Sequence, residues 1–113
     1  MKKVIFIGGT SYSGSTLLDL ILANDKKGYS LGEVVAIFRP SMFYHFDKIK
    51  ELKKDAKWRE LINSGENNLY LNLFDIFSDI DYFVDSSKNP FWISKQMKIL
   101  NKVLFWAYSA LVF

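Results

Sequence analysis

The sequence predicts a three-layer α/β domain with a short parallel β-sheet flanked by helices, and three observations support this fold class. A β-rich run at 3–7 is apolar on both faces, which is typical of a strand buried in a parallel sheet. A glycine-rich loop and an apolar helical segment follow this run, and a second core strand is predicted at 82–85. Such alternation of strands and helices favours parallel strands joined by right-handed crossovers.

Helical spacing and helix-breaking residues place the elements of the first half. The Leu- and Ile-rich stretch 16–23 is predicted as a helix that ends near 24–28, and 29–33 as a short extended piece or turn. One or two helical turns at 34–39 end at Pro40.

A longer helix is predicted after Ser41, which is a suitable cap. Its apolar stripe has steps of three and four residues and consists of Met42, Phe46, Ile49, Leu52 and Ala56. The charged residues between them are expected to form a solvated face. His45 lies near the apolar side, and we expect a structural role for it.

The second half contains a buried helix at 69–77 and a helix that Asn89 caps with Pro90 as its first residue, ending near Leu100. A third strand is predicted at 103–106. Four aromatic residues near these elements are expected in the core, and they are Phe91, Trp92, Phe105 and Trp106.

Composition limits the classes of function. The 113 residues suit one domain, and 50% apolar residues argue against disorder. The absence of cysteine excludes a disulfide framework, a thiolate zinc site and a cysteine nucleophile. A net charge of +3 is too small to indicate nucleic-acid binding. A polar stretch interrupts the first apolar run and the last one is short, so we expect a cytoplasmic protein without a membrane span.

The glycine-rich loop is the strongest functional signal. Gly9 and Gly14 bracket four residues, and Ser15 and Thr16 follow, which is the spacing of a nucleotide P-loop with Ser15 in the lysine position. Glycines let consecutive N–H groups converge on an anion, and the start of a helix adds partial positive charge. The loop therefore predicts a phosphate cradle, with a ligand-free turn as the alternative.

Three motifs in the same order resemble the sulfotransferases that use 3'-phosphoadenosine 5'-phosphosulfate. The family loop is close to G-G-x-x-R-S-G-S/T-T-L-L, and this chain has GGTSYSGSTLL at 8–18. SLGE at 30–33 is similar to the family's Gly-Glu element, and DSSKNPF at 85–91 is similar to its lysine-bearing element. The resemblance covers nearly the whole chain up to about Leu100.

The resemblance implies transfer of a sulfuryl group to a hydroxyl or amine of a small-molecule or carbohydrate acceptor, without a metal. It implies that Glu33 is the general base and that Lys88 stabilises the transferring group. The residues that it implies for the phosphosulfate are Ser11, Tyr12, Ser13, Gly14, Ser15, Thr16 and Leu17. As alternatives, Glu33 is a helix-start carboxylate and Lys88 a surface lysine, while Asp85 is expected to accept hydrogen bonds from loop N–H groups.

Two departures from the family put turnover by this short chain in doubt. Tyr12 replaces the loop arginine, and no arginine follows Arg59 to bind the 3'-phosphate. We therefore expect a truncated sulfotransferase-like domain that binds its donor weakly and self-associates through an exposed sheet edge. A P-loop nucleotide kinase or nucleotide-binding fragment is one alternative function, and a non-catalytic remnant or interaction module is another.

Overall fold

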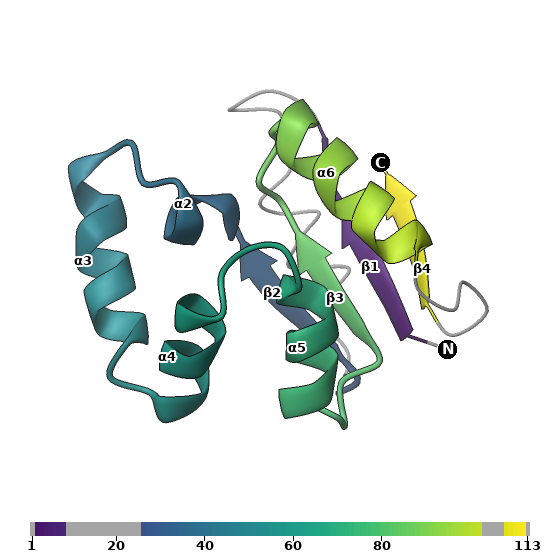
Figure 1. Cartoon of the computed structure of the whole chain (residues 1–113), viewed down its shortest axis with the longest axis horizontal. Coiled ribbons are helices and arrows are strands. Elements are labelled where there is room, and N and C mark those ends of the chain that lie inside the picture. The colour runs from purple at the N-terminus through teal and green to yellow at the C-terminus, as the bar shows by residue number, and fades with distance from the viewer. Residues whose placement is uncertain (1, 9–25, 103–107, 113) are drawn as a thin grey trace.

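Four parallel strands form the centre of the structure, in the order β2-β3-β1-β4 (Figure 1). They are β1 (Lys2–Phe6), β2 (Gly28–Gly32), β3 (Tyr82–Asp85) and β4 (Tyr108–Val112). The computed structural model describes residues 2–8 and 26–102, and the backbone of 108–112. Each neighbouring pair of strands is parallel, which confirms the predicted parallel sheet.

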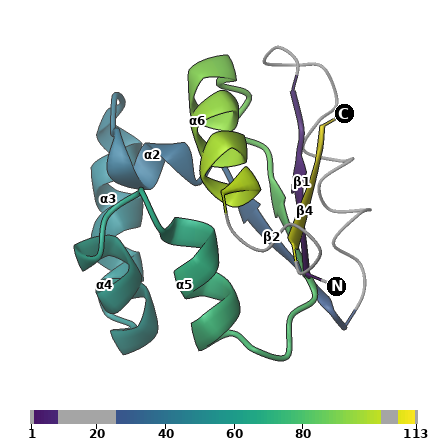
Figure 2. The ribbon, with the colours of Figure 1, turned by 45° about the vertical axis from the view of Figure 1, so that its right-hand side comes forward.

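The five described helices lie together on one face of this sheet (Figure 2). They are α2 (Val35–Phe38), α3 (Phe43–Leu52), α4 (Ala56–Asn63), α5 (Leu69–Ile76) and α6 (Pro90–Asn101). The helix predicted at 16–23 lies outside the described residues. The described residues thus show two layers of the predicted α/β architecture, namely the parallel sheet and one layer of helices.

Alternate residues of the central strands are buried on opposite faces of the sheet. Val4, Phe6 and Phe83 pack with the helices in the main hydrophobic core. Ile5 and Val84 belong to a second buried cluster on the other face. Burial on both faces explains the apolar run at 4–7, which follows the two lysines that begin β1.

The predicted stripe from Met42 to Ala56 is wrong as one helix, because α3 ends at Leu52 and α4 begins at Ala56. The Asp55 carboxylate accepts hydrogen bonds from the N–H groups of Lys57 and Trp58 and so starts a new helix. Met42 and Phe46 are exposed, so the core-facing side of α3 is shifted from the predicted stripe.

Met42, and not the predicted Ser41, is the N-cap of α3, and the side chain of His45 bonds back to the start of the helix. Its buried imidazole accepts hydrogen bonds at Nδ1 from the backbone N–H groups of Ser41, at 3.0 Å, and Met42, at 3.1 Å. The structural role expected for His45 is confirmed, because these bonds satisfy donors at the start of α3.

Three further predictions about the elements have different outcomes. The segment predicted at 29–33 as an extended piece or turn is the edge strand β2, paired with β3. The strand predicted at 103–106 lies outside the described residues, and β4 begins later, at Tyr108. Trp92 is fully buried as expected, whereas Phe91 is 81% exposed, which corrects its placement in the core. Phe105 and Trp106 lie outside the described residues.

Candidate anion-binding site

The carboxyl ends of β1, β2 and β3 meet at one edge of the sheet, and hydrogen bonds connect them. The Ile7 N–H at the end of β1 donates to the Asp85 carbonyl at 2.8 Å. The Ser86 N–H donates to the Gly32 carbonyl at 2.9 Å, which joins β3 to the end of β2. Ligands of open α/β sheets bind outside the carboxyl ends of the strands, so this edge is the candidate site.

A third hydrogen bond directly connects the turn after β2 to the loop after β3. The Val35 N–H, at the start of α2, donates to the Ser87 hydroxyl at 3.0 Å. The turn that carries Glu33 is therefore held against the loop that carries Lys88. These two segments are 55 residues apart in the sequence, and the pairing of β2 with β3 brings them together.

Asp85 anchors the Lys88 loop from inside the protein. Its carboxylate is fully buried and accepts hydrogen bonds from the Ser87 N–H at 2.9 Å, the Trp92 indole N–H at 2.8 Å and the Tyr70 hydroxyl. Burial raises the pKa of Asp85, and these donors oppose that rise. The structure confirms Asp85 as an acceptor for a loop N–H, and adds Tyr70 and Trp92 as donors.

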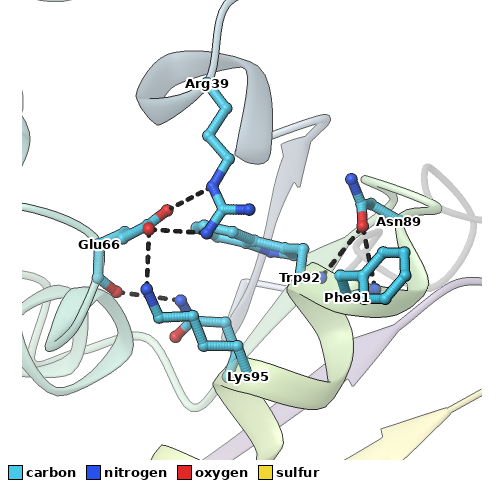
Figure 3. A network of polar contacts seen from close by, with 7 residues as sticks. Arg39, Glu66, Asn89, Phe91, Trp92 and Lys95 are labelled. Atoms are coloured by element: carbon cyan, nitrogen blue, oxygen red, sulfur yellow. Dashed lines mark hydrogen bonds and ion pairs between the residues drawn. The ribbon is translucent and has the colours of Figure 1, made fainter.

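Asn89 fixes the far end of the same loop. Its side-chain oxygen accepts hydrogen bonds from the N–H groups of Phe91, at 3.0 Å, and Trp92, at 3.1 Å (Figure 3). Pro90 is the first residue of α6, where a backbone N–H would have no partner within the helix, so its absence costs no hydrogen bond. The cap predicted from the sequence is confirmed, and the loop is thus anchored on both sides of Lys88.

Lys88 has a backbone conformation that is uncommon for a residue with a side chain. Its φ is +60°, in the left-handed region that favours glycine. Such a conformation costs on the order of 1 kcal/mol and is held by the surrounding structure. The hydrogen bonds at Asp85 and Asn89 supply that restraint. They hold the Lys88 backbone in this unfavourable conformation and so fix the point from which its side chain extends.

Lys88 and Gly8 line one cavity of about 550 Å³, which we call the edge cavity. Its other described residues are Pro90, Ile93, Ser94, Met97, Lys98 and Asn101. The cavity therefore contains two lysines and the residue at which β1 leads into the glycine-rich loop, and no acidic residue is among its described lining. This combination suits an anion that has an apolar portion.

Glu33 is exposed and follows Gly32, whose φ of +60° makes the tight turn at the end of β2. The Glu33 carbonyl accepts a hydrogen bond from the Ala36 N–H at 3.0 Å. Glu33 does not line the edge cavity among the described residues. The structure thus places the two predicted catalytic residues on adjoining loops, with Lys88 facing the cavity and Glu33 on the neighbouring strand end.

The seven residues predicted to hold the donor lie outside the described residues, and they are Ser11, Tyr12, Ser13, Gly14, Ser15, Thr16 and Leu17. Among the described residues, no group of three or more His, Asp or Glu side chains is placed to hold a metal ion. The described part of the site consists of Gly8, the Gly32–Glu33 turn and the loop from Asp85 to Asn89.

Arg39 is engaged in an ion pair that sequence reasoning missed. Its guanidinium donates to both carboxylate oxygens of Glu66, at 2.9 and 3.2 Å, and Lys95 contacts the same carboxylate at 2.8 Å (Figure 3). The hydrogen bond from Arg39 is the main reason why the pKa of Glu66 is lowered. The charge of Arg39 is therefore already balanced by a carboxylate.

Comparison with known proteins adds no assignment to this geometry: no protein-family model matches the chain, and neither a curated protein nor a solved structure matches it significantly. Within the described residues, no helix combines the length and the apolar character needed to cross a membrane.

Proposed function

We propose that this chain binds 3'-phosphoadenosine 5'-phosphosulfate at the carboxyl edge of its sheet and belongs to the sulfotransferase-like proteins. The observation that carries the proposal is the joining of the Glu33 turn to the Lys88 loop, through Val35 and Ser87, beside the end of β1. The three motifs that resemble the family are at 8–18, 30–33 and 85–91. The described parts of all three lie at the edge where an α/β sheet binds its ligand.

Lys88 is the cation of the proposed reaction. As the acceptor oxygen attacks sulfur, the bond between sulfur and the bridging oxygen of the 5'-phosphate breaks, and negative charge grows on that oxygen. A fixed ammonium group stabilises such charge most when it needs no reorganisation during the reaction. The anchored loop from Asp85 to Asn89 provides this fixation for the Lys88 backbone.

Glu33 is the proposed general base. Its exposed carboxylate takes the proton that the acceptor hydroxyl or amine loses when the new bond to sulfur forms. The products are the sulfated acceptor, the protonated carboxyl group and 3'-phosphoadenosine 5'-phosphate. The exposed position suits an acceptor that arrives from solvent, such as a small molecule or a carbohydrate.

Calorimetric titration tests this proposal, with 3'-phosphoadenosine 5'-phosphate as the ligand and ATP with magnesium as the comparison. We expect the bisphosphate to bind, and Lys88→Ala to weaken binding about tenfold, as expected for loss of a hydrogen bond to a charged group. Lys50→Ala, an exposed lysine of α3, is the control that removes the same charge elsewhere.

Two results of this titration would contradict the proposal. Binding of ATP with magnesium alone would favour a P-loop nucleotide kinase or nucleotide-binding fragment. Binding of neither ligand by the folded chain would favour a non-catalytic remnant or interaction module.

A further inference from the structure

A second cavity, of about 660 Å³, lies between the start of α5 and the length of α6. We call it the α5–α6 groove. Three of its lining residues are lysines, namely Lys95 and Lys98 of α6 and Lys102, which directly follows α6. Its size is within the range of small-molecule sites, which are about 300–1,000 Å³.

Two of these lysines have no counter-charge in the described structure. Lys95 is committed to Glu66, with 2.8 Å between its Nζ and the carboxylate (Figure 3). Lys98 and Lys102 are exposed and make no ion pair with any described residue. They are four residues apart at the C-terminal end of α6, where like charges repel each other. An anion between them would relieve that repulsion.

Three apolar residues and three polar ones complete the lining of the groove, and the polar ones are Asn67, Asn68 and Ser94. Leu71 of α5 and Ile99 of α6 are half-buried, and the Phe91 ring at the start of α6 is 81% exposed. Phe91 is therefore a large apolar surface left uncovered beside Trp92, which is fully buried. A ligand that covers Phe91, Leu71 and Ile99 would gain from removing their apolar surface from water.

We propose that the α5–α6 groove binds a small amphiphilic anion, which has an apolar chain or ring and one carboxylate, sulfate or phosphate group. The apolar part packs on Phe91, Leu71 and Ile99, and the anionic group pairs with Lys98 and Lys102. This site differs from the donor site, because Lys102 lines the groove and not the edge cavity, whereas Lys88 lines the edge cavity and not the groove. Lys98 and Ser94 form the ridge of α6 between the two cavities.

Titration of the isotope-labelled chain with octanoate, followed by amide NMR shifts, tests this inference. We expect the largest shifts at the groove, in Leu71, Phe91, Lys98, Ile99 and Lys102. Lys102→Gln should weaken octanoate binding about fivefold, the effect of losing one partly exposed ion pair. Its control is Lys50→Gln on α3, which should leave octanoate affinity unchanged.

Two further ligands test whether both halves of the amphiphile are required. Octanol has the apolar chain without the charge, and inorganic phosphate has the charge without the chain, so each should bind more weakly than octanoate. Equal binding by either would overturn the inference, as would octanoate shifts centred on the exposed aromatic residues of α3. Lys102→Gln should leave 3'-phosphoadenosine 5'-phosphate binding unchanged, and a parallel loss of both ligands would contradict a separate site.

Discussion

The Ser87 hydroxyl accepts a hydrogen bond from the Val35 backbone N–H at 3.0 Å, and this contact joins two loops that the sequence places far apart. Ser87 precedes Lys88, and Val35 begins the helix that follows Glu33. The neighbouring bond from the Ser86 N–H to the Gly32 carbonyl supports the same junction. The relative position of the two proposed catalytic residues thus depends on one side-chain and one backbone hydrogen bond just after the end of β3.

Ser87→Ala should lower the free energy of unfolding by about 1 kcal/mol, because it leaves the partly buried Val35 N–H without its acceptor. Urea unfolding measures this loss. Ser78→Ala, at an exposed position after α5, should change stability by less than about 0.5 kcal/mol. Equal stability of the Ser87 variant and the wild type would mean that the contact does not hold the loops together.

Lys88→Gly should be more stable than Lys88→Ala by about 1 kcal/mol, because glycine adopts a φ of +60° without the steric cost that alanine has. Both variants lack the ammonium group, so the comparison isolates the backbone. Thermal or urea unfolding of the two proteins measures the difference. If alanine were equally stable, Lys88 would not be held in a costly conformation.

Tyr70→Phe should lower the free energy of unfolding by about 1.5–3 kcal/mol near neutral pH, because the buried Asp85 carboxylate loses a donor. Burial raises the pKa of Asp85, so its contribution to stability is greatest at low pH and falls as pH rises from about 4 through its folded pKa. The Tyr70 hydroxyl opposes that rise in pKa. Tyr70→Phe should therefore raise the folded pKa of Asp85 further, and the variant should lose more stability than the wild type as pH rises.

Urea unfolding of this variant at about pH 5 and about pH 7.5 checks the sign, and the deficit relative to wild type should be larger at the higher pH. Tyr44→Phe is the matched control, since its hydroxyl is on an exposed residue of α3. A deficit that is larger at the lower pH would contradict the assignment of Asp85 as a buried charged acceptor.

Glu66→Gln should lower stability by less than about 1 kcal/mol, because its ion pairs with Arg39 and Lys95 are near the surface. These partners lower the pKa of Glu66, so its contribution is present above the unfolded pKa and is lost as pH falls through the folded pKa. The deficit should also shrink at about 1 M salt, where charges are screened. Unfolding at two salt concentrations measures it, and a salt-independent deficit would show that packing dominates.

Local signals predicted the second half of the fold well. Asn89 followed by Pro90 marks the start of α6, because the Asn89 side chain accepts hydrogen bonds from N–H groups within three residues, and β3 is a short β-rich run. The stripe from Met42 to Ala56 failed because periodicity alone does not reveal that Asp55 starts a new helix.

Contacts between distant residues limited what the sequence could predict about the site. The acceptor role of Asp85 was predictable from its place at a strand end, but its donors Tyr70 and Trp92 come from two different helices. Arg39 and Glu66 are 27 residues apart, and nothing in their local sequence indicates that they pair. Apolar residues lie on both sides of Ala107, and the sequence prediction placed a strand at 103–106, whereas β4 is Tyr108–Val112.

The location of the bisphosphate site tests the central claim most directly. Amide NMR shifts recorded during titration with 3'-phosphoadenosine 5'-phosphate should be largest at Gly8, in the turn at Gly32 and Glu33, and in the loop 86–88. Shifts confined to surfaces away from the carboxyl edge of the sheet, or no shifts at all in the folded chain, would contradict the account.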